Sequence, residues 1–459
     1  MRPRQSAPRL SLPTALRRGP MSATALAAAI GASPRSSLRM LGEAQANIVS
    51  FGAAGRTRYA WRHPLRGETG PLPLFSVDAQ GRVAEVAALS LIEPAGSHCA
   101  LGAAGWPVDA ASRDGLWDGL PYPLYDMQPQ GFLGRSFARR EHRSLEVASD
   151  PREWSDDDVT FVLSRRGADT GGNLILGELA LQGFQHELAR PAEALPATAT
   201  AAAYLQMAEA TVAQGLAGSS AAGEFPKFTA LRELPGAASP HVIVKFSGPL
   251  DAPATRRWGD LLVCEHLAGT AVAGLPGLAA ARSRVLQSGE RLFLESERFD
   301  RPGRFGRSAL VSLQAIDGHL FGLSTQDWRV HARTLAGHAL LSAEDALAVQ
   351  RLWWFGRLIA NSDMHLGNLS FVPQAGRLVL APSYDMLPMA FAPLPGGEVP
   401  ALHWAPELPP PAQAAVWQEA AAAALAFWQQ AAADGRISAG FRAQCATQAA
   451  GLQTLIGRV

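Results

Sequence analysis

The fold of this chain depends most on the stretch Asn361-Ser362-Asp363-Met364-His365-Leu366-Gly367-Asn368. An apolar, tryptophan-rich run precedes it at residues 352–360, and short apolar runs follow at residues 369–372 and 378–381. A second acidic residue, Asp385, comes shortly after the last run. Runs of this length and composition predict a buried helix, a polar loop and a short hairpin that ends at an acidic position.

The polar side chains of this stretch are those that phosphoryl transfer requires. Asp363 can orient an attacking hydroxyl group and accept its proton. Asn368 and Asp385 can hold Mg²⁺ against the phosphates of a nucleotide, because Mg²⁺ prefers hard oxygen ligands. His365 has no partner at a metal-binding spacing, so we expect it to brace the loop by hydrogen bonds. The alternative is a polar turn whose Asp and Asn side chains only cap neighbouring backbone groups.

Length and composition limit the classes of protein that fit. The chain has 459 residues, 47% hydrophobic and 18% charged, so two or three domains with sizeable cores are expected. A net charge of +1 excludes a protein that coats polyanions over its whole surface but allows local basic patches. The three scattered cysteines argue against a disulfide framework or zinc site and favour a reducing cytoplasm. No apolar run approaches the length of a membrane span, so no membrane partner is expected.

Residues 1–62 have the pattern of a winged helix-turn-helix, in which three short helices are followed by two strands. These elements are expected at residues 12–18, 22–30, 33–41, 47–51 and 57–61. Ser22 and Ser33 are the expected N-caps of the second and third helices, and Gly31 is the expected end of the second.

DNA contacts are expected from the third helix and the wing. The side chains predicted to face DNA are Arg35, Ser36, Ser37 and Arg39 in the helix, and Arg56 and Arg58 in the wing. The alternative is a small helical module that binds protein or only packs against the rest of the chain. One such module binds DNA weakly, so a dimer or a protein partner is expected if operator DNA is the ligand.

Residues 63–195 predict a small β-rich subdomain. Alternating runs at residues 74–77 and 82–89 predict a hairpin around Asp78-Ala79-Gln80-Gly81. Glycine and proline punctuate residues 126–135, which we expect to pack this subdomain against the region that follows.

The acidic run after Ser155 could be interpreted as a metal site, but the start of a helix is the simpler interpretation. Ser155 before three aspartates predicts an N-cap and a charged first turn, in a helix that ends near Arg166. An Ala/Pro-rich linker at residues 192–203 marks the next domain boundary.

Residues 196–459 predict a nucleotide-binding region. A loop of small residues at 215–227 precedes a strand and can let backbone N–H groups approach phosphates. Lys245 stands near the end of an alternating strand and can pair with the α- and β-phosphates, with Glu265 of the next helix as its partner. Considered without the other motifs, Lys245 could instead be a solvated residue at the end of its strand.

Three motifs together resemble the HipA-type serine/threonine kinases. They are D-x-H-x-x-N at residues 363–368 with the later Tyr384-Asp385, S-x-x-G-x-x-x-K at residues 220–227, and E-R-F-D-R at residues 297–301. Residues 126–135 resemble a segment of the branch that carries an N-terminal winged helix, known as HipH or YjjJ. The resemblance is good over the last part of the chain, from about residue 200, and moderate in the middle.

The resemblance implies roles for several residues. Lys245 and Glu265 would set the phosphates of ATP, and Glu297 and Phe299 would offer backbone groups to adenine at the hinge between two lobes. His365 would brace the catalytic loop, as its counterpart in the family does.

The glycine-rich loop would carry a regulatory site. Ser220, with Gly223 in the same loop, matches the position at which family members phosphorylate themselves and so silence the enzyme. The better-known family members follow E-R-F-D-R with a segment rich in Gln, Glu and Asp, whereas residues 312–318 here read Ser-Leu-Gln-Ala-Ile-Asp-Gly. This departure leaves the ATP site intact and puts the protein substrate in doubt.

The predicted fold is α+β, a bilobal protein-kinase-like (HipA-like) fold with an N-terminal winged helix-turn-helix and a small β-rich subdomain. The predicted domains are residues 1–62, 63–195 and 196–459, the last with an N-lobe over about 200–300 and a mostly helical C-lobe over about 301–459. The predicted function is that of a cytoplasmic toxin kinase that uses ATP and Mg²⁺ to phosphorylate a protein. Operator DNA is the expected partner of the head, which could take the place of a separate antitoxin protein. A transcription regulator that only senses nucleotide and a small-molecule phosphotransferase are the alternatives.

Overall fold

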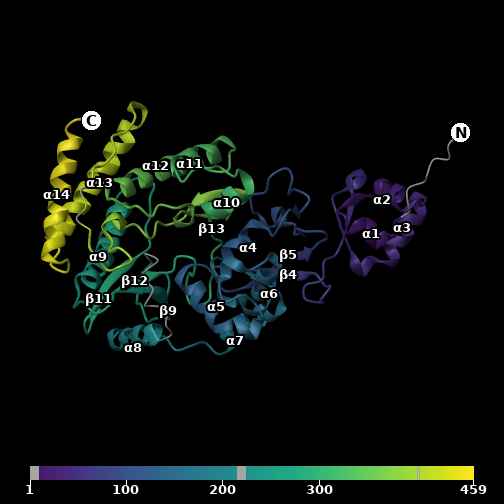
Figure 1. Cartoon of the computed structure of the whole chain (residues 1–459), viewed down its shortest axis with the longest axis horizontal. Coiled ribbons are helices and arrows are strands. Elements are labelled where there is room, and N and C mark those ends of the chain that lie inside the picture. The colour runs from purple at the N-terminus through teal and green to yellow at the C-terminus, as the bar shows by residue number, and fades with distance from the viewer. Residues whose placement is uncertain (1–9, 214–223, 401, 403) are drawn as a thin grey trace.

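The computed structural model describes residues 10–213, 224–400, 402 and 404–459. These residues form an α+β molecule with a small N-terminal head, a central domain and a larger C-terminal part (Figure 1). The head lies at one end of the long axis, and the last two helices, α13 (Ala414–Ala433) and α14 (Ala439–Ile456), lie at the other. Within the described ranges, no helix combines the length and apolar character needed to cross a membrane.

Three helices and a three-stranded antiparallel sheet of order β1-β3-β2 make up the head. The elements are α1 (Leu12–Leu16), β1 (Met21–Ser22), α2 (Ala23–Ile30), α3 (Pro34–Glu43), β2 (Ile48–Phe51) and β3 (Arg58–Trp61). Ser22 and Ser33 cap α2 and α3 as predicted, and Gly31 ends α2 in the left-handed conformation at φ +63°. Leu16 and Leu26, both 0% exposed, anchor the apolar core of the head.

The prediction that Ser37 contacts DNA is wrong. Its side chain is 0% exposed, and its hydroxyl donates to the carbonyl oxygen of Ser33 at 3.0 Å. A helix advances by about 100° per residue, so Ser37 falls on the same buried face as Leu41 rather than beside Arg35 and Arg39.

A five-stranded sheet of order β7-β6-β5-β4-β8 organises the central domain. Its elements are β4 (Leu72–Val77), β5 (Val83–Leu91), β6 (Ser97–His98), β7 (Leu116–Trp117), α4 (Tyr122–Met127), α5 (Gly131–Leu145), α6 (Asp156–Arg166), β8 (Leu174–Leu176) and α7 (Glu178–Ala189). β4 and β5 form the predicted hairpin. Ser155 is the predicted N-cap of α6, and its backbone N–H donates to the Asp158 carboxylate in a capping box.

Residues 126–135 pack the central domain against the C-terminal part, as expected. Asp126 accepts hydrogen bonds from the backbone N–H and the hydroxyl of Ser312, at 2.5 Å and 2.6 Å. Glu224 accepts from the Phe132 N–H at 2.8 Å and pairs with Arg135 at 2.7 Å.

The N-lobe of the C-terminal part is a four-stranded antiparallel sheet of order β11-β12-β10-β9 between two helices. Its elements are α8 (Thr200–Ala213), β9 (Lys227–Leu231), β10 (His241–Phe246), α9 (Pro253–Ala273), β11 (Ser283–Ser288) and β12 (Arg291–Glu297). Along β12, Phe293 packs with Tyr204 of α8, whereas Leu292 and Leu294 belong to the large core that contains α9. Alternation along the strand therefore places α8 and α9 on opposite faces of the sheet.

The C-lobe is mostly helical, as predicted. Its elements before α13 are β13 (Val311–Ser312), α10 (Leu313–Leu320), α11 (Trp328–Gly337), α12 (Ala343–Leu358), β14 (Ser370–Gln374) and β15 (Arg377–Leu380). Trp417 and Trp428 are core residues, as expected, with side chains that are 0% and 1% exposed. Their indole N–H groups donate to the backbone carbonyl oxygens of Glu407 and Leu358.

Candidate active site

Helix α12 leads into the loop that carries Asp363. At its end, the Asn361 N–H donates to the Gly356 carbonyl oxygen at 2.9 Å, and Ala360 adopts the left-handed conformation at φ +61°. Glycine is the usual residue at such a helix end, so Ala360 carries roughly 1 kcal/mol of strain. The buried side chain of Asn361 accepts the Asp363 N–H at 3.0 Å and so fixes the backbone that carries Asp363.

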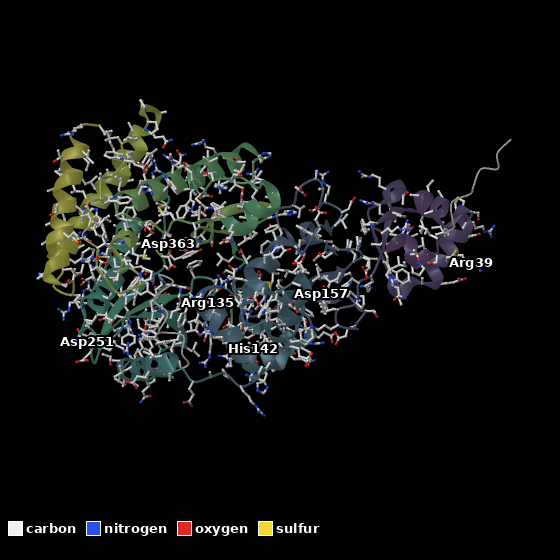
Figure 2. The ribbon with its side chains drawn as sticks, in the orientation of Figure 1. Arg39, Arg135, His142, Asp157, Asp251 and Asp363 are labelled. Atoms are coloured by element: carbon white, nitrogen blue, oxygen red, sulfur yellow. The ribbon has the colours of Figure 1, made fainter. Side chains whose placement is uncertain are left out.

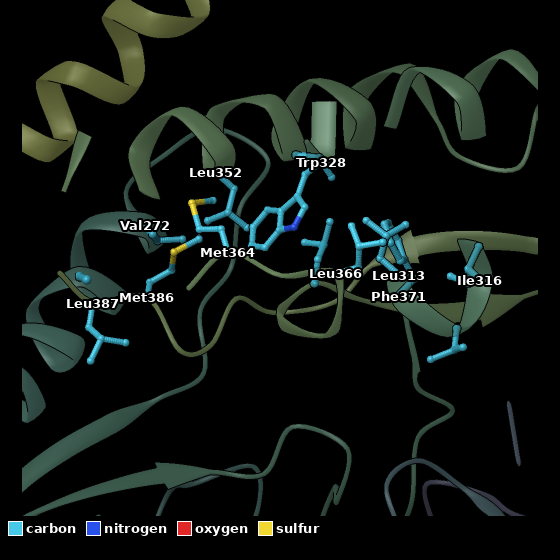
Figure 3. Close-up of a cluster of buried hydrophobic side chains, with 14 of the residues drawn as sticks. Val272, Leu313, Ile316, Trp328, Leu352, Met364, Leu366, Phe371, Met386 and Leu387 are labelled. Atoms are coloured by element: carbon cyan, nitrogen blue, oxygen red, sulfur yellow. The ribbon is translucent and has the colours of Figure 1, made fainter. Parts of the chain in front are cut away.

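Apolar side chains seat this loop in the C-lobe core (Figure 3). Met364 and Leu366 are 6% and 7% exposed, and they lie in the same cluster as Trp328 of α11. Burial alternates along the loop, which leaves Asp363 and His365 exposed on the opposite side. The core thus holds the loop in place while its polar side chains stay accessible.

Hydrogen bonds within the loop and its neighbour hold the polar residues. Asn368 donates its side-chain amide to the Asp363 carbonyl oxygen at 2.8 Å, which leaves its own side-chain oxygen for another ligand. His365 accepts the Gly367 N–H at Nδ1 at 3.1 Å, a bracing bond of the expected kind. The Tyr384 hydroxyl donates to the Gly367 carbonyl oxygen at 2.9 Å and ties the loop to the segment that carries Asp385.

Lys245 lies between two carboxylates. Its ammonium group is 2.7 Å and 2.8 Å from the two carboxylate oxygens of Glu265, and 2.5 Å from Asp385 Oδ1. The contact between Lys245 and Glu265 is the one predicted from the sequence. β10 supplies Lys245, α9 supplies Glu265, and Asp385 follows β15 at φ +55°.

Because one ammonium group serves two carboxylates, the pKa values of all three groups shift. Burial opposes the charge on Lys245, but the charges of Asp385 and Glu265 outweigh burial and raise its pKa. Burial raises the pKa of Glu265 to about 7 against the lowering effect of Lys245. The pKa of Asp385 is lowered to about 2, since the charges of Lys245 and Lys227 outweigh its burial. Asp385 is therefore the firmly ionised carboxylate of the group at neutral pH.

Asp363 lies within electrostatic reach of this group. Neighbouring protein atoms keep part of the water from its otherwise exposed carboxylate and so raise its pKa; the charges of Asp385 and Glu224 add to the rise, while His365 and Lys245 lower it. A raised pKa makes the Asp363 carboxylate a better proton acceptor near neutral pH.

A pocket of about 310 Å³ adjoins Lys245 and has mostly apolar walls, a size in the range of ligand sites. Lys245, Glu265 and Asp385 line it, together with residues 296–300 of the segment between the lobes. The Glu297 N–H already donates to the Arg282 carbonyl oxygen, so it is not free for a base. The Phe299 N–H has no partner among the described residues.

The structure brings most of the predicted kinase residues to one region. Lys245, Glu265, Glu297, Phe299 and Asp385 line the pocket, and Asp363, His365 and Asn368 lie on the loop beside it. Ser220 and Gly223 lie outside the described residues. The predicted DNA contacts are in the head, where Arg39 lies far from Asp363 (Figure 2).

The predicted DNA-facing arginines are exposed. These are Arg35, Arg39, Arg56 and Arg58. Ser36 is half-buried, and its hydroxyl lies 2.9 Å from that of Ser33. Leu38, which sequence reasoning did not single out, is 51% exposed on α3 between Arg35 and Arg39.

Sequence reasoning missed three side chains that hold the site together: Asn361, Glu224 and Gln326. Gln326 accepts the Leu366 N–H at 3.1 Å, and Glu224 pairs with Lys227 at 3.1 Å. Asn361 could have been found, because an Asn that caps a backbone N–H two residues ahead is a common turn signal. No local signal marks Gln326 or the bonds of Glu224 to Phe132 and Arg135, since these partners are distant in the sequence.

Asn368 and Asp385 have the chemistry of a Mg²⁺ site. No group of three His, Cys, Asp or Glu side chains in the described ranges could hold a metal ion by itself. Mg²⁺ commonly binds one or two protein oxygen ligands together with substrate phosphates. A site of two protein residues that a nucleotide completes fits this pattern.

Comparison with known proteins places two parts of the chain in families. The YjjJ-like toxin middle domain matches residues 68–185, and the HipA-like C-terminal domain matches residues 219–448. The protein named Toxin YjjJ of Escherichia coli (strain K12) is 37% identical over 432 residues, which cover 93% of this chain and 94% of that protein.

Two solved structures show weaker similarity. One is the Shewanella oneidensis MR-1 toxin–antitoxin system of HipA, HipB and its operator DNA, with 14% identity and a TM-score of 0.47 over 84% of this chain and 97% of the matched chain. The other is the Helicobacter pylori proinflammatory kinase CtkA, with 16% identity and a TM-score of 0.27 over 36% of this chain and 53% of that chain.

Proposed function

This chain belongs to the HipA-like family, in the branch of the YjjJ toxins, and on that premise we propose that it is an ATP- and Mg²⁺-dependent serine/threonine protein kinase fused to a DNA-binding head. The observation that carries the proposal is the position of Lys245 between Glu265 and Asp385, where all three side chains line a mostly apolar pocket beside the Asp363 loop. Three requirements of a nucleotide site are therefore met side by side. Lys245 is a cation for the phosphates, Asp385 is an ionised carboxylate for a metal ion, and the pocket is an apolar space for the base.

Each residue of the site has a role in this proposal. Lys245, steadied by Glu265, binds the α- and β-phosphates, and the Phe299 N–H meets the base. Asn368 and Asp385 hold Mg²⁺ through their side-chain oxygens. Bound ATP supplies the γ-phosphoryl group, and bound Mg²⁺ neutralises its negative charge.

Asp363 acts on the acceptor. Its carboxylate orients the hydroxyl of a serine or threonine of the substrate protein and accepts the proton as the new O–P bond forms, while the bond between the γ-phosphorus and the β,γ-bridging oxygen breaks and ADP leaves. Asn361 and Asn368 hold the Asp363 backbone from two sides, so the carboxylate is presented in a fixed position.

Replacing Asp363 tests the kinase proposal. Wild-type protein incubated with γ-labelled ATP, Mg²⁺ and cleared cell extract is expected to transfer label to itself or to extract proteins. In Asp363→Asn the rate of labelling should fall by about a hundredfold or more, because general-base catalysis is lost. Ser362→Ala, an exposed neighbour on the same loop, should label as wild type does. Equal labelling by wild type and Asp363→Asn would remove the assigned base.

DNA binding by the head is a separate part of the proposal. Arg35 and Arg39 are exposed on α3, and the ion pair of Arg39 with Glu43 at 3.3 Å is a surface pair of little strength. Both arginines are therefore free to reach phosphates or base edges.

The double variant Arg35→Ala/Arg39→Ala tests the head. Fluorescence anisotropy at low salt measures its affinity for a 30-base-pair duplex of arbitrary sequence, which should fall by about tenfold. The slope of the logarithm of the binding constant against the logarithm of salt concentration should correspond to about two fewer phosphate contacts. Arg82→Ala/Arg436→Ala removes the same charge from exposed sites outside the head and should bind as wild type does. If both double variants bind alike, α3 is not the DNA-contacting helix.

A further inference from the structure

The central domain contributes directly to the pocket beside Lys245. Gly171 lines this pocket together with residues 296–300 of the segment between the lobes. Lys245 and Asp385 mark the phosphate end of the proposed nucleotide site. Gly171 lies next to Gly172, whose N–H donates to Asp300 at 3.1 Å, so it stands beside the segment between the lobes, where the base would lie.

A charged network fixes this part of the central domain against the segment between the lobes. Asp169 accepts from Arg301 at 2.8 Å and from Arg298 at 3.4 Å. Asp300 accepts from Arg301 at 2.7 Å and from the Gly172 N–H at 3.1 Å. Arg301 also donates to the carbonyl oxygens of Gly172, at 2.7 Å, and of Thr170.

The network depends on Asp169 because its arginines are buried and need carboxylate partners. Asp300 and Arg301 are 7% and 3% exposed, and Arg307, which donates to the Ala168 carbonyl oxygen, is 4% exposed. Neighbouring protein atoms keep part of the water from the Asp169 carboxylate, which raises its pKa, but the charges of Arg298, Arg301 and Arg307 outweigh this effect and lower it. Without Asp169, Arg298 and Arg301 would share the single carboxylate of Asp300, at 3.0 Å and 2.7 Å.

We propose that the turn at residues 169–172 of the central domain is a wall of the nucleotide site, in which Gly171 borders the base and Asp169 is a positioning residue for residues 297–299. The inference rests on the proposed ATP site and adds to it a part that lies outside the kinase lobes. Since Asp169 holds Arg298 and Arg301, it acts on the base through the Phe299 backbone rather than by touching the nucleotide.

The geometry at Gly171 allows a sharp test. A Cβ atom built at Gly171 meets nothing within 4 Å, and its backbone is not in the left-handed region. A Cβ atom at this position therefore fits without a change in the protein, and we expect a larger side chain built on it to take space beside the pocket. Gly435, in an exposed turn of the C-lobe, has the same two properties and lies away from the pocket.

The experiment measures binding of the ATP analogue AMP-PNP with Mg²⁺ to the full chain by isothermal titration calorimetry. Gly171→Leu is expected to raise Kd at least about tenfold at an unchanged Tm, because the new side chain competes with the base. Gly435→Leu is expected to bind the analogue as wild type does. Wild-type affinity in Gly171→Leu would overturn the proposed wall and leave the kinase proposal standing. Absence of binding by wild type would instead overturn the ATP site itself.

Asp169→Asn is the second variant. It tests whether the turn at residues 169–172 is a wall of the nucleotide site even if Gly171→Leu destabilises the protein and lowers its Tm. The Asp169 side chain is 54% exposed, so solvent weakens its ion pairs and a moderate effect is expected. KM for ATP should rise by about fivefold with little change in kcat, since the chemical groups are untouched. Glu68→Gln, which weakens an exposed ion pair with Arg165 in the same domain, should leave KM unchanged. An unchanged KM in Asp169→Asn would overturn its positioning role.

Discussion

Phosphoryl transfer is expected to fall at least about a thousandfold when Asp385 is replaced by Asn, because a metal ion contributes several kcal/mol of charge stabilisation and each 1.4 kcal/mol is tenfold in rate. Asp385 is the ionised carboxylate of the site, with its pKa lowered to about 2. An asparagine oxygen carries no full charge and holds Mg²⁺ much less well.

The fold should survive this change. Lys245 keeps Glu265 as a partner at 2.7 Å, so no buried cation is left alone. Asparagine also tolerates the left-handed conformation that Asp385 adopts at φ +55°. Transfer of label from ATP is the measurement, with Tm as the check on folding. Asp251→Asn, at an exposed site on the N-lobe (Figure 2), is the matched control and should keep full activity. Full activity in Asp385→Asn would contradict the metal role.

The largest loss of stability is expected from Glu295→Ala in the N-lobe sheet. Glu295 is 3% exposed and accepts from Tyr204 at 2.6 Å, from Arg284 at 2.7 Å and from Arg232, which is 1% exposed. Removing one partner of a buried ion pair leaves the other charge unpaired, at a cost of about 3–5 kcal/mol in the free energy of unfolding.

Urea denaturation of the full chain measures this loss. Glu290→Ala removes the same charge from the exposed turn of the same hairpin and should change the free energy of unfolding by less than about 0.5 kcal/mol. A loss below about 1 kcal/mol in Glu295→Ala would show that Arg232 reaches water or another partner in the variant.

Local patterns predicted the elements because their causes are local. Ser22, Ser33 and Ser155 cap helices as expected, since an N-cap bonds a backbone N–H within its own first turn. The hairpin of β4 and β5 follows from alternating runs around a turn with Gly81. Ser37 shows the limit of such reasoning: a run of neighbouring polar residues was predicted to face DNA, although helical rotation places Ser37 in the core.

The sequence by itself determined the α+β class, several of the helices and strands, among them α2, α3, α6 and the hairpin of β4 and β5, and the chemical types gathered around Asp363, Lys245 and Asp385. Periodicity, caps and turn residues act within a few positions of the chain, so they can be read without a fold. The tertiary structure decided which distant charges meet: Lys245 with Asp385, Glu224 with Arg135, and Asp169 with Arg301. These pairs form only when separate elements pack, because their energies depend on burial and on distances of a few ångströms between side chains far apart in the sequence.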